Sequence, residues 1–195
     1  MFNGMFGVIK QIAYKTKGGA WRPFGVDLAT WALNIIDYAH HEIHSGSSFF
    51  VYENAVLGNG NVLDIAITTP NTTKWSHLIL HLDVSAGCVF DMLEDVTSFA
   101  GGAATIPANR NRNSTNVSVN TCLNGNTITA DAIVPTGGTA VWNESVGVRG
   151  IVWSRSSGEE IILKQNSNYL FRVTNGANAN TVTMLLNWYE HTDRN

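Results

Sequence analysis

From residue 45 onward, apolar and polar residues alternate in short runs, and this two-residue period is typical of half-buried β-strands. The clearest run is residues 74–85, where Leu78, Leu80 and Leu82 fall on one face and mainly polar and aromatic residues fall on the other. Clusters of Gly, Asn and Pro separate the runs, and these residues favour turns. The predicted strands are residues 48–56, 62–69, 74–85, 88–94, 117–122, 127–130, 139–142, 160–164, 169–174 and 181–189.

The turn residues also predict which strands are joined as hairpins. Residues 58–61, Gly-Asn-Gly-Asn, form a hairpin-type turn between the first two strands. Residues 88–94 are the expected hairpin partner of 74–85 across Ala86 and Gly87. Eight or more short strands with frequent turns predict an all-β fold, a jelly-roll-like β-sandwich that spans residues 45–195.

The first 44 residues follow a different pattern. Residues 1–26 contain scattered glycines, lysines and aromatic residues without a sustained period, which indicates an extended N-terminal arm. In residues 27–39 the apolar positions recur every three to four residues, and Asp27 is placed to cap them, so we expect one short helix. Residues 27–44 therefore form a predicted helix and His-rich connector before the sandwich.

Composition narrows the class of protein. The chain has 195 residues, of which 14% are charged, and a net charge of −3, so it lacks the basic surface of a direct nucleic-acid binder. No apolar run is long enough to span a membrane. The beginning of the sequence shows no secretory signal, so we expect synthesis in a cytoplasm. Cys88 and Cys122 have no CxxC spacing and are expected to be core residues without a disulfide.

Three of the six histidines lie in His40-His41-Glu42-Ile43-His44. His40 and His44 share a face in a helix or a strand, so two metal ligands are possible there. The metalloprotease signature His-Glu-x-x-His is not matched, because His41 stands where the catalytic glutamate belongs. Two interpretations remain open: imidazoles that cap carbonyls and pack at a helix end, or an intersubunit metal site formed by His40 and His44.

Other sequence patterns of catalysis are missing. There is no Gly-x-Ser-x-Gly motif, no Gly-x-Gly-x-x-Gly motif and no Walker A stretch, so we expect no enzyme activity and no cofactor. Residues 109–113, Asn-Arg-Asn-Arg-Asn, are unusual in a chain with so few charges. Arg110 and Arg112 could bind carboxylates of a partner, or they could simply keep a surface loop soluble.

Five segments together resemble a family of tailed-bacteriophage virion structural proteins. They are residues 36–49 (IDYAHHEIHSGSSF), 68–75 (TTPNTTKW), 109–114 (NRNRNS), 162–172 (ILKQNSNYLFR) and 187–192 (NWYEHT). The resemblance runs from about residue 27 to the end of the chain. It implies no catalytic residues.

The resemblance implies a capsid decoration, or cement, protein: a β-sandwich that forms a homotrimer, binds the major capsid protein on the outer surface of the virion and stabilises the shell. The alternative is the head-binding or receptor-binding part of a fibre or tail component. The arm is too apolar for a free tail, so we expect it to contact the capsid or a neighbouring subunit. The predicted contact residues are Phe2, Phe6, Ile9, Tyr14, Trp21, Phe24, Arg110 and Arg112.

Overall fold

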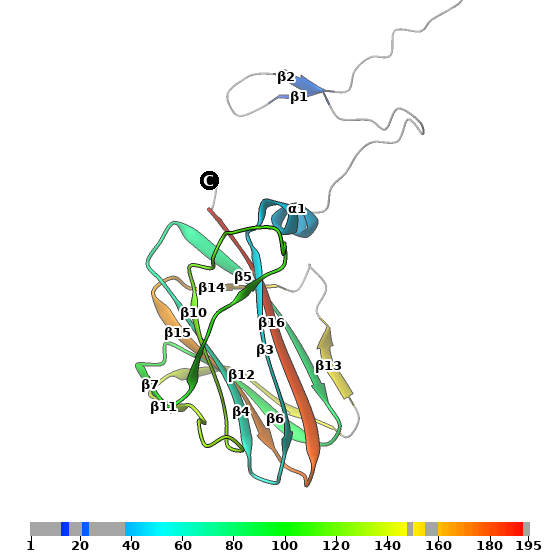
Figure 1. The fold of residues 1–195 in the computed structure, drawn as a ribbon, viewed down its shortest axis with the longest axis vertical. Helices are drawn as coiled ribbons and strands as arrows, with labels where there is room; N and C mark the ends of the chain where they lie inside the picture. The colour runs from blue at the N-terminus through cyan, green and yellow to red at the C-terminus, as the bar shows by residue number, and fades with distance from the viewer. Residues whose placement is uncertain (1–12, 16–20, 24–37, 148–149, 155–159, 193–195) are drawn as a thin grey trace, which may run out of the picture. The chain divides into compact units, whose positions relative to one another are not determined.

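The computed structural model describes residues 13–15, 21–23, 38–147, 150–154 and 160–192 (Figure 1). The chain divides into two compact units, residues 1–37 and 38–195. In the first unit, β1 (Ala13–Lys15) pairs antiparallel with β2 (Trp21–Pro23). The sequence does not predict this pair, because three-residue strands are too short to show a period. The other residues of the predicted arm, and residues 27–37 of the predicted helix, lie outside the described residues.

The second unit begins with the helix α1 (Tyr38–Ser45) and continues as two large antiparallel sheets. The first, called the β16 sheet, has the order β13-β5-β16-β3-β9, and β14 also pairs with β5. Its strands are β3 (Ser48–Leu57), β5 (Lys74–Val84), β9 (Ala108–Asn109), β13 (Gly150–Ser154), β14 (Ile161–Leu163) and β16 (Asn180–Thr192).

The second large sheet, called the β15 sheet, has the order β12-β6-β15-β4-β10-β8. Its strands are β4 (Val62–Thr69), β6 (Cys88–Glu94), β8 (Ala103–Thr105), β10 (Thr121–Asn126), β12 (Thr139–Val146) and β15 (Ser167–Asn175). A separate two-stranded sheet is formed by β7 (Ser98–Ala100) and β11 (Val134–Thr136).

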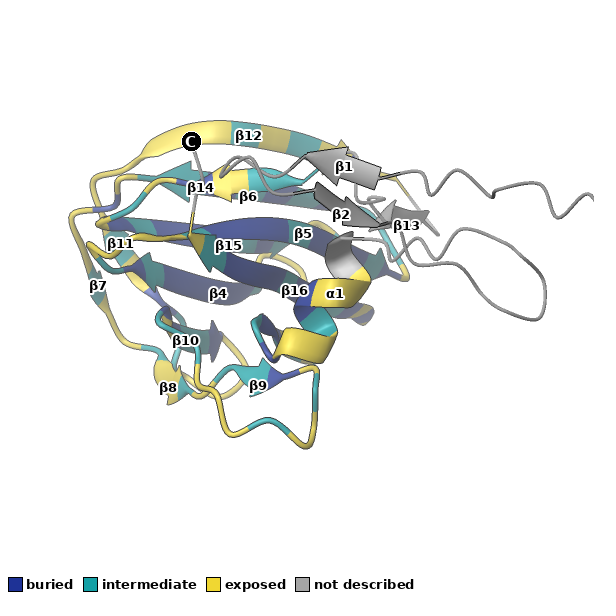
Figure 2. Cartoon of the chain, turned by 90° about the horizontal axis from the view of Figure 1, so that it is seen from above, coloured by how far each residue is buried: buried dark blue, intermediate teal, exposed yellow. Residues whose placement is uncertain are grey.

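The two large sheets pack face to face, as the alternation predicts. Leu78, Leu80 and Leu82 of β5 are buried, and they join one core with residues of both sheets. The central strands are accordingly the most deeply buried, whereas much of β12 and α1 faces solvent (Figure 2). Burying each large apolar side chain stabilises the fold by about 1.5–3 kcal/mol. The expected all-β sandwich is confirmed.

The connections differ from the expected hairpins. β3 and β4 belong to different sheets, and so do β5 and β6, so the turns at residues 58–61 and 85–87 cross from one sheet to the other. Both hairpin predictions are therefore wrong. Each strand of these pairs buries one apolar face, and the faces meet across the core instead of lying side by side. The jelly-roll topology stays a prediction, which this alternation between sheets supports.

Two buried asparagines hold these crossings at one end of the sandwich. Asn175, at the end of β15, donates from Nδ2 to the carbonyl of Leu57 at 2.9 Å, next to the β3–β4 turn. Asn180, at the start of β16, accepts from the backbone N–H groups of Ser85 at 2.9 Å and Ala86 at 2.8 Å. The Asn180 amide also donates to the Asn175 side chain at 2.9 Å. One pair of amides therefore joins two corners that are remote in sequence.

The outer face of the β15 sheet is covered by the segment between β6 and β12. Val96 and Ile133 of this segment pack with Ala66 and Leu170 in a second apolar cluster. Nearby, the fully buried carboxylate of Asp64 accepts two hydrogen bonds from Arg172, at 2.8 and 2.9 Å, and one from the Ile133 N–H at 3.1 Å. Burial raises the pKa of Asp64, and the Arg172 partner opposes that rise.

In this covering segment the sequence predictions were least accurate. The strand expected at 117–122 is β10, which begins only at Thr121 and extends to Asn126. Residues 127–130 form a turn instead of a strand, because the Asn126 side chain accepts the N–H groups of Ile128 and Thr129, both at 3.0 Å. The strands at 62–69 and 88–94 match β4 and β6 in both bounds.

Both cysteines are free and buried, as expected. Among the residues that the structure describes, no helix is long and apolar enough to cross a membrane.

Candidate functional site

The structure brings two of the predicted features together at one end of the sandwich: the His-rich segment and the Arg-containing loop. The His-rich segment is helical, since α1 runs to Ser45. The helix ends in a Schellman motif, in which the N–H of Gly46 donates to Ile43 at 3.1 Å and the N–H of Ser47 donates to Glu42 at 3.0 Å. Gly46 has a φ of +75°, which glycine adopts without strain.

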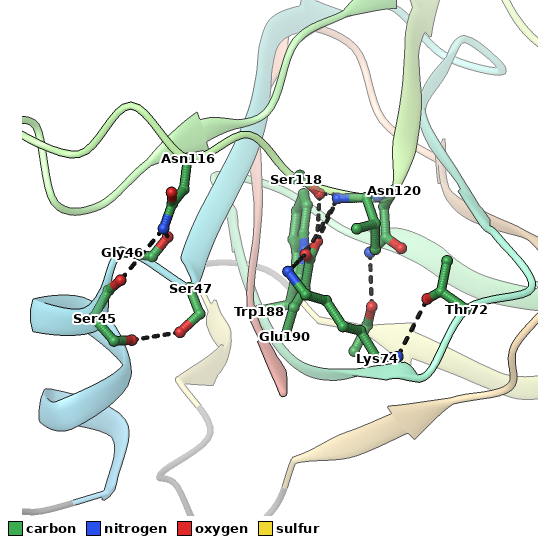
Figure 3. Close-up of polar contacts among 12 residues, drawn as sticks. Ser45, Gly46, Ser47, Thr72, Lys74, Asn116, Ser118, Asn120, Trp188 and Glu190 are labelled. Carbon is green, nitrogen blue, oxygen red and sulfur yellow. Dashed lines mark hydrogen bonds and ion pairs between the residues drawn. The ribbon is translucent and has the colours of Figure 1, made fainter. Parts of the chain in front are cut away.

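Asparagines of the neighbouring loop bind the carbonyls that remain at this helix end. Asn111 donates from Nδ2 to the carbonyl of His44 at 3.1 Å, and Asn109 donates to the carbonyl of Gly46 at 2.8 Å. Asn116 donates to the carbonyl of Ser45 at 3.4 Å (Figure 3). The loop thus satisfies backbone acceptors that a helix end leaves without intrahelical partners. It holds α1 against the sandwich.

The two arginines of the same loop face outward. Arg110 and Arg112 are exposed, whereas Asn109 is buried and Asn111 is half-buried. Arg112 donates from Nη1 to the carbonyl of Asn109 at 3.2 Å, within the loop. Within the described part of the chain, neither guanidinium forms an ion pair. The loop therefore presents two guanidinium groups to solvent while its asparagines fix its backbone.

His40 and His44 lie one turn apart on the exposed face of α1. Their Nε2 atoms are 2.9 Å apart, and their ring centroids are 4.7 Å apart. Glu42 points the other way: it is buried, and its Oε2 accepts the Ser47 hydroxyl at 2.5 Å. Glu42 would share a face with the two histidines only in a strand, so it is not available as their third ligand. Among the described residues, no group of three or more His, Cys, Asp or Glu side chains could hold a metal ion.

A buried carboxylate fixes the other end of the loop, at residues 118–120. The Glu190 side chain is fully buried in β16. Its Oε1 accepts from the Ser118 hydroxyl at 2.5 Å, the Val119 N–H at 3.1 Å and Trp188 Nε1 at 3.1 Å (Figure 3). Lys74 Nζ lies 4.0 Å from Glu190 Oε2. Since the charge is paired and hydrogen-bonded, burial of this carboxylate is compensated, and the loop is held at both ends.

Outward-facing side chains at the start of β5 and at the end of β16 form a pocket that the sequence did not reveal. In the register of the β16 sheet, Tyr189 lies opposite His77 and His191 opposite Trp75, while β14 places Ile162 beside His77. The pocket has a volume of about 170 Å³. A cavity of this order accepts one small ring, whereas drug-sized ligands need roughly 300 Å³ or more. Its lining residues are Trp75, His77, Ile162 and His191.

A carboxylate fixes the orientation of the His77 ring in this pocket. His77 Nδ1 lies 2.9 Å from Glu160 Oε1, and the Tyr189 hydroxyl donates its one hydrogen to the Glu160 carboxylate, with the two carboxylate oxygens 2.9 and 2.8 Å away. His77 and Tyr189 also stack, with ring centroids 4.7 Å apart. Because the Glu160 carboxylate is an acceptor, it assigns the proton of neutral His77 to Nδ1, which leaves Nε2 as an acceptor. The pocket therefore combines aromatic faces with one oriented imidazole.

The remaining predicted contact residues fall in the first unit. Tyr14 lies on β1 and Trp21 on β2, whereas Phe2, Phe6, Ile9 and Phe24 lie outside the described residues. No protein-family model, curated protein or solved structure matches the chain.

Proposed function

We propose that this chain is a non-enzymatic structural protein of a tailed-bacteriophage particle. In this proposal it is a decoration, or cement, protein: a homotrimer binds the major capsid protein on the outside of the head and stabilises the shell. The resemblance of five sequence segments to virion structural proteins supports the proposal. The observation that carries it is the end of the sandwich formed by α1 and residues 109–116.

This end has the properties of a binding surface on a rigid scaffold. The loop backbone is fixed by Asn109, Asn111 and Asn116, so little conformational entropy is lost when a partner binds. Arg110 and Arg112 are exposed in the same loop, and guanidinium groups bind carboxylates through two parallel hydrogen bonds. We therefore infer that the partner surface is acidic, with carboxylates opposite these two arginines.

Stabilisation of the shell follows from mass action. A protein that binds the assembled lattice and not the separated subunits shifts the equilibrium toward the assembled state. A threefold position on the shell is best matched by a cyclic trimer, because homo-oligomers form closed symmetric assemblies. In this proposal, the arm of residues 1–26 anchors each subunit to the capsid or to its neighbour, with its lysines complementing acidic groups.

The arginines can be tested with heads from which this protein has been removed. Arg110→Ala with Arg112→Ala should weaken binding to these heads about tenfold for each lost arginine–carboxylate pair, since 1.4 kcal/mol corresponds to a factor of ten. Arg110→Lys with Arg112→Lys keeps the charge but loses the paired geometry, so binding should be intermediate. Val117→Ser, at an exposed position of the same loop, is the matched control and should bind like the parent. Parental binding by the double Ala variant would refute the assigned contact.

The arm can be tested separately. Deleting residues 2–24 should leave a folded β-protein, because the large sheets belong to residues 38–195. Far-ultraviolet circular dichroism checks the fold, and co-sedimentation with depleted heads measures binding. We expect the deletion to lose binding. If the truncated protein decorates heads with parental affinity, the arm is not the anchor.

One observation favours the alternative function, a receptor-binding part of a fibre or tail component. The pocket lined by Trp75, His77 and His191 offers an aromatic face and an oriented imidazole. A sugar ring matches this arrangement, because its C–H groups are attracted to the negative face of an aromatic ring and its hydroxyls donate hydrogen bonds. Trp75→Ala distinguishes the functions: a receptor-binding part loses attachment of particles to cells, whereas a decoration protein retains both attachment and head binding. Hundreds of copies per virion indicate decoration, and a handful indicates a fibre or tail.

A further inference from the structure

His40 and His44 bring two ring nitrogens together on the exposed face of α1. His40 and His44 are both exposed, and their Nε2 atoms approach to 2.9 Å. In neutral imidazoles one Nε2 carries the shared hydrogen and the other accepts it. Both Nε2 lone pairs can point to the same position once the donor ring carries its proton on Nδ1 instead. The pair then offers two nitrogen ligands without any net release of protons.

At their present separation the two nitrogens suit one coordination geometry better than another. Metal–imidazole bonds are about 2.0–2.1 Å long, so two nitrogens 2.9 Å apart subtend an angle of about 90° at the metal. Tetrahedral Zn²⁺ would place the nitrogens about 3.3 Å apart at the same bond length. An angle of about 90° is that of adjacent ligands in square-planar, tetragonal or octahedral complexes. Nitrogen-containing sites of tetragonal geometry are typical of Cu²⁺ and Ni²⁺.

We propose that His40 and His44 of a single chain chelate a divalent Cu²⁺ or Ni²⁺ ion through their Nε2 atoms, with water in the remaining positions. This site differs from the intersubunit site that the sequence suggests, because two nitrogens of one helix already have the required separation. Affinity follows the order in which Cu²⁺ exceeds both Ni²⁺ and Zn²⁺.

The surrounding structure prepares the pair for binding. The Schellman motif fixes the end of α1, and Asn111 holds the carbonyl of His44 itself. Glu42, on the inner side of the helix, anchors it through the Ser47 hydroxyl. The two imidazoles are therefore held on a helix whose end cannot unwind without breaking these bonds, and preorganisation of this kind reduces the cost of binding.

Other histidines provide the controls. His41 is exposed on the same helix but adjoins Glu42 instead of the pair, with Nδ1 at 3.4 Å from Glu42 Oε1. His81 Nε2 is bound to Asp83 at 2.8 Å. A loss of metal binding that depends on position 40 or 44, and not on position 41, therefore identifies the chelating pair.

The test uses the full chain without an affinity tag, after removal of metal by a chelator. Calorimetric titration with CuCl₂ and with NiCl₂ should give one ion per chain, with Cu²⁺ bound more tightly. His40→Ala and His44→Ala should each lose this isotherm, whereas His41→Ala should retain it. Electron paramagnetic resonance of the Cu²⁺-loaded chain should show nitrogen hyperfine structure from imidazole, which either single variant changes.

Three results would overturn the proposal. The first is a parent chain that binds neither ion. The second is a His40→Ala or His44→Ala variant that binds like the parent, or a His41→Ala variant that loses binding equally. The third is a ratio of one ion per three chains, which would assign the ion to a site shared between subunits. Circular dichroism of each variant verifies that the sandwich is intact, so a lost isotherm reports on the ligands.

Discussion

Replacing Asn180 with alanine should be among the most damaging single polar substitutions in the sandwich. The side chain is fully buried at the start of β16. Its Oδ1 accepts the N–H groups of Ser85 and Ala86, and its Nδ2 donates to the carbonyl of Ala86 at 3.0 Å and to Asn175. The substitution therefore removes the amide that holds the crossing from β5 to β6.

The magnitude follows from the groups that lose a partner. The Ser85 N–H keeps a second acceptor, the carbonyl of Thr181 at 3.0 Å. Ala86, in contrast, loses the side-chain partner of both its N–H and its carbonyl. A buried group left unsatisfied costs about 1–3 kcal/mol. Because Ala86 is half-buried, each of its two groups should cost about 1.5 kcal/mol, so we expect a loss of about 3 kcal/mol in the free energy of unfolding. For a chain of this length, that loss lowers Tm by about 6–12 °C.

Urea unfolding followed by circular dichroism measures the change, and thermal unfolding provides the Tm. Asn178→Ala is the matched control, because Asn178 is an exposed asparagine in the same turn. Surface substitutions of this kind change stability by about 0.5 kcal/mol or less. If Asn180→Ala destabilises no more than Asn178→Ala, the buried amide does not hold the corner, and the reasoning fails.

Three further predictions concern chemistry and assembly. Burial raises the pKa of Cys88 to about 11 and that of Cys122 to about 12, so both thiols should resist alkylation in the native protein and react only after unfolding, as mass spectrometry would show. Hydrogen bonds from Ser167 and Lys164 lower the pKa of Asp95 from its ordinary value of 3.8. These bonds therefore stabilise the folded protein at pH values above 3.8, and the stabilisation is lost as the pH falls through the lower pKa of the folded state. Asp95→Asn should thus melt below the parent near neutral pH, with the difference vanishing in acid; a difference that persists there contradicts this assignment. Light scattering of the purified chain should give the mass of a trimer, and a concentration-independent monomer would contradict the proposed assembly.

Local patterns predicted the strands well where one face is buried and turns are marked by Gly, Asn or Pro. The alternation in β5 and the bounds of β4 and β6 are of this kind. The pairing of those strands was not predictable in the same way. A turn such as residues 58–61 can close a hairpin or cross between sheets, and the choice is stabilised by Asn175 and Asn180, which lie more than 90 residues away from the corners they hold.

In the candidate site too, single residue types stood out in the sequence, whereas contacts between residues distant in sequence did not. In residues 109–113 the sequence points to Arg110 and Arg112, yet the asparagines that alternate with them bind α1 and the residue that follows it. The pocket was missed because its residues come from β5, β14 and β16, and each has an ordinary place in its own strand. The pairing of His77 with Glu160 joins positions 83 residues apart, so no local motif marks it.

Asparagine and arginine alternate in residues 109–113, and the two residue types have different roles in this loop. Asn109 and Asn111 are committed to the fold, because their side chains bind backbone carbonyls. Within the described part of the chain, the Arg110 side chain makes no such bond and the Arg112 side chain makes one, to the Asn109 carbonyl of the same loop. Both side chains are exposed, so they can be exchanged for acidic, aromatic or small ones while Asn109 and Asn111 keep the loop in place. A lineage carrying this protein could therefore change its partner through two codons without passing through an unstable intermediate, and an engineer could use the same two positions to display a new recognition element.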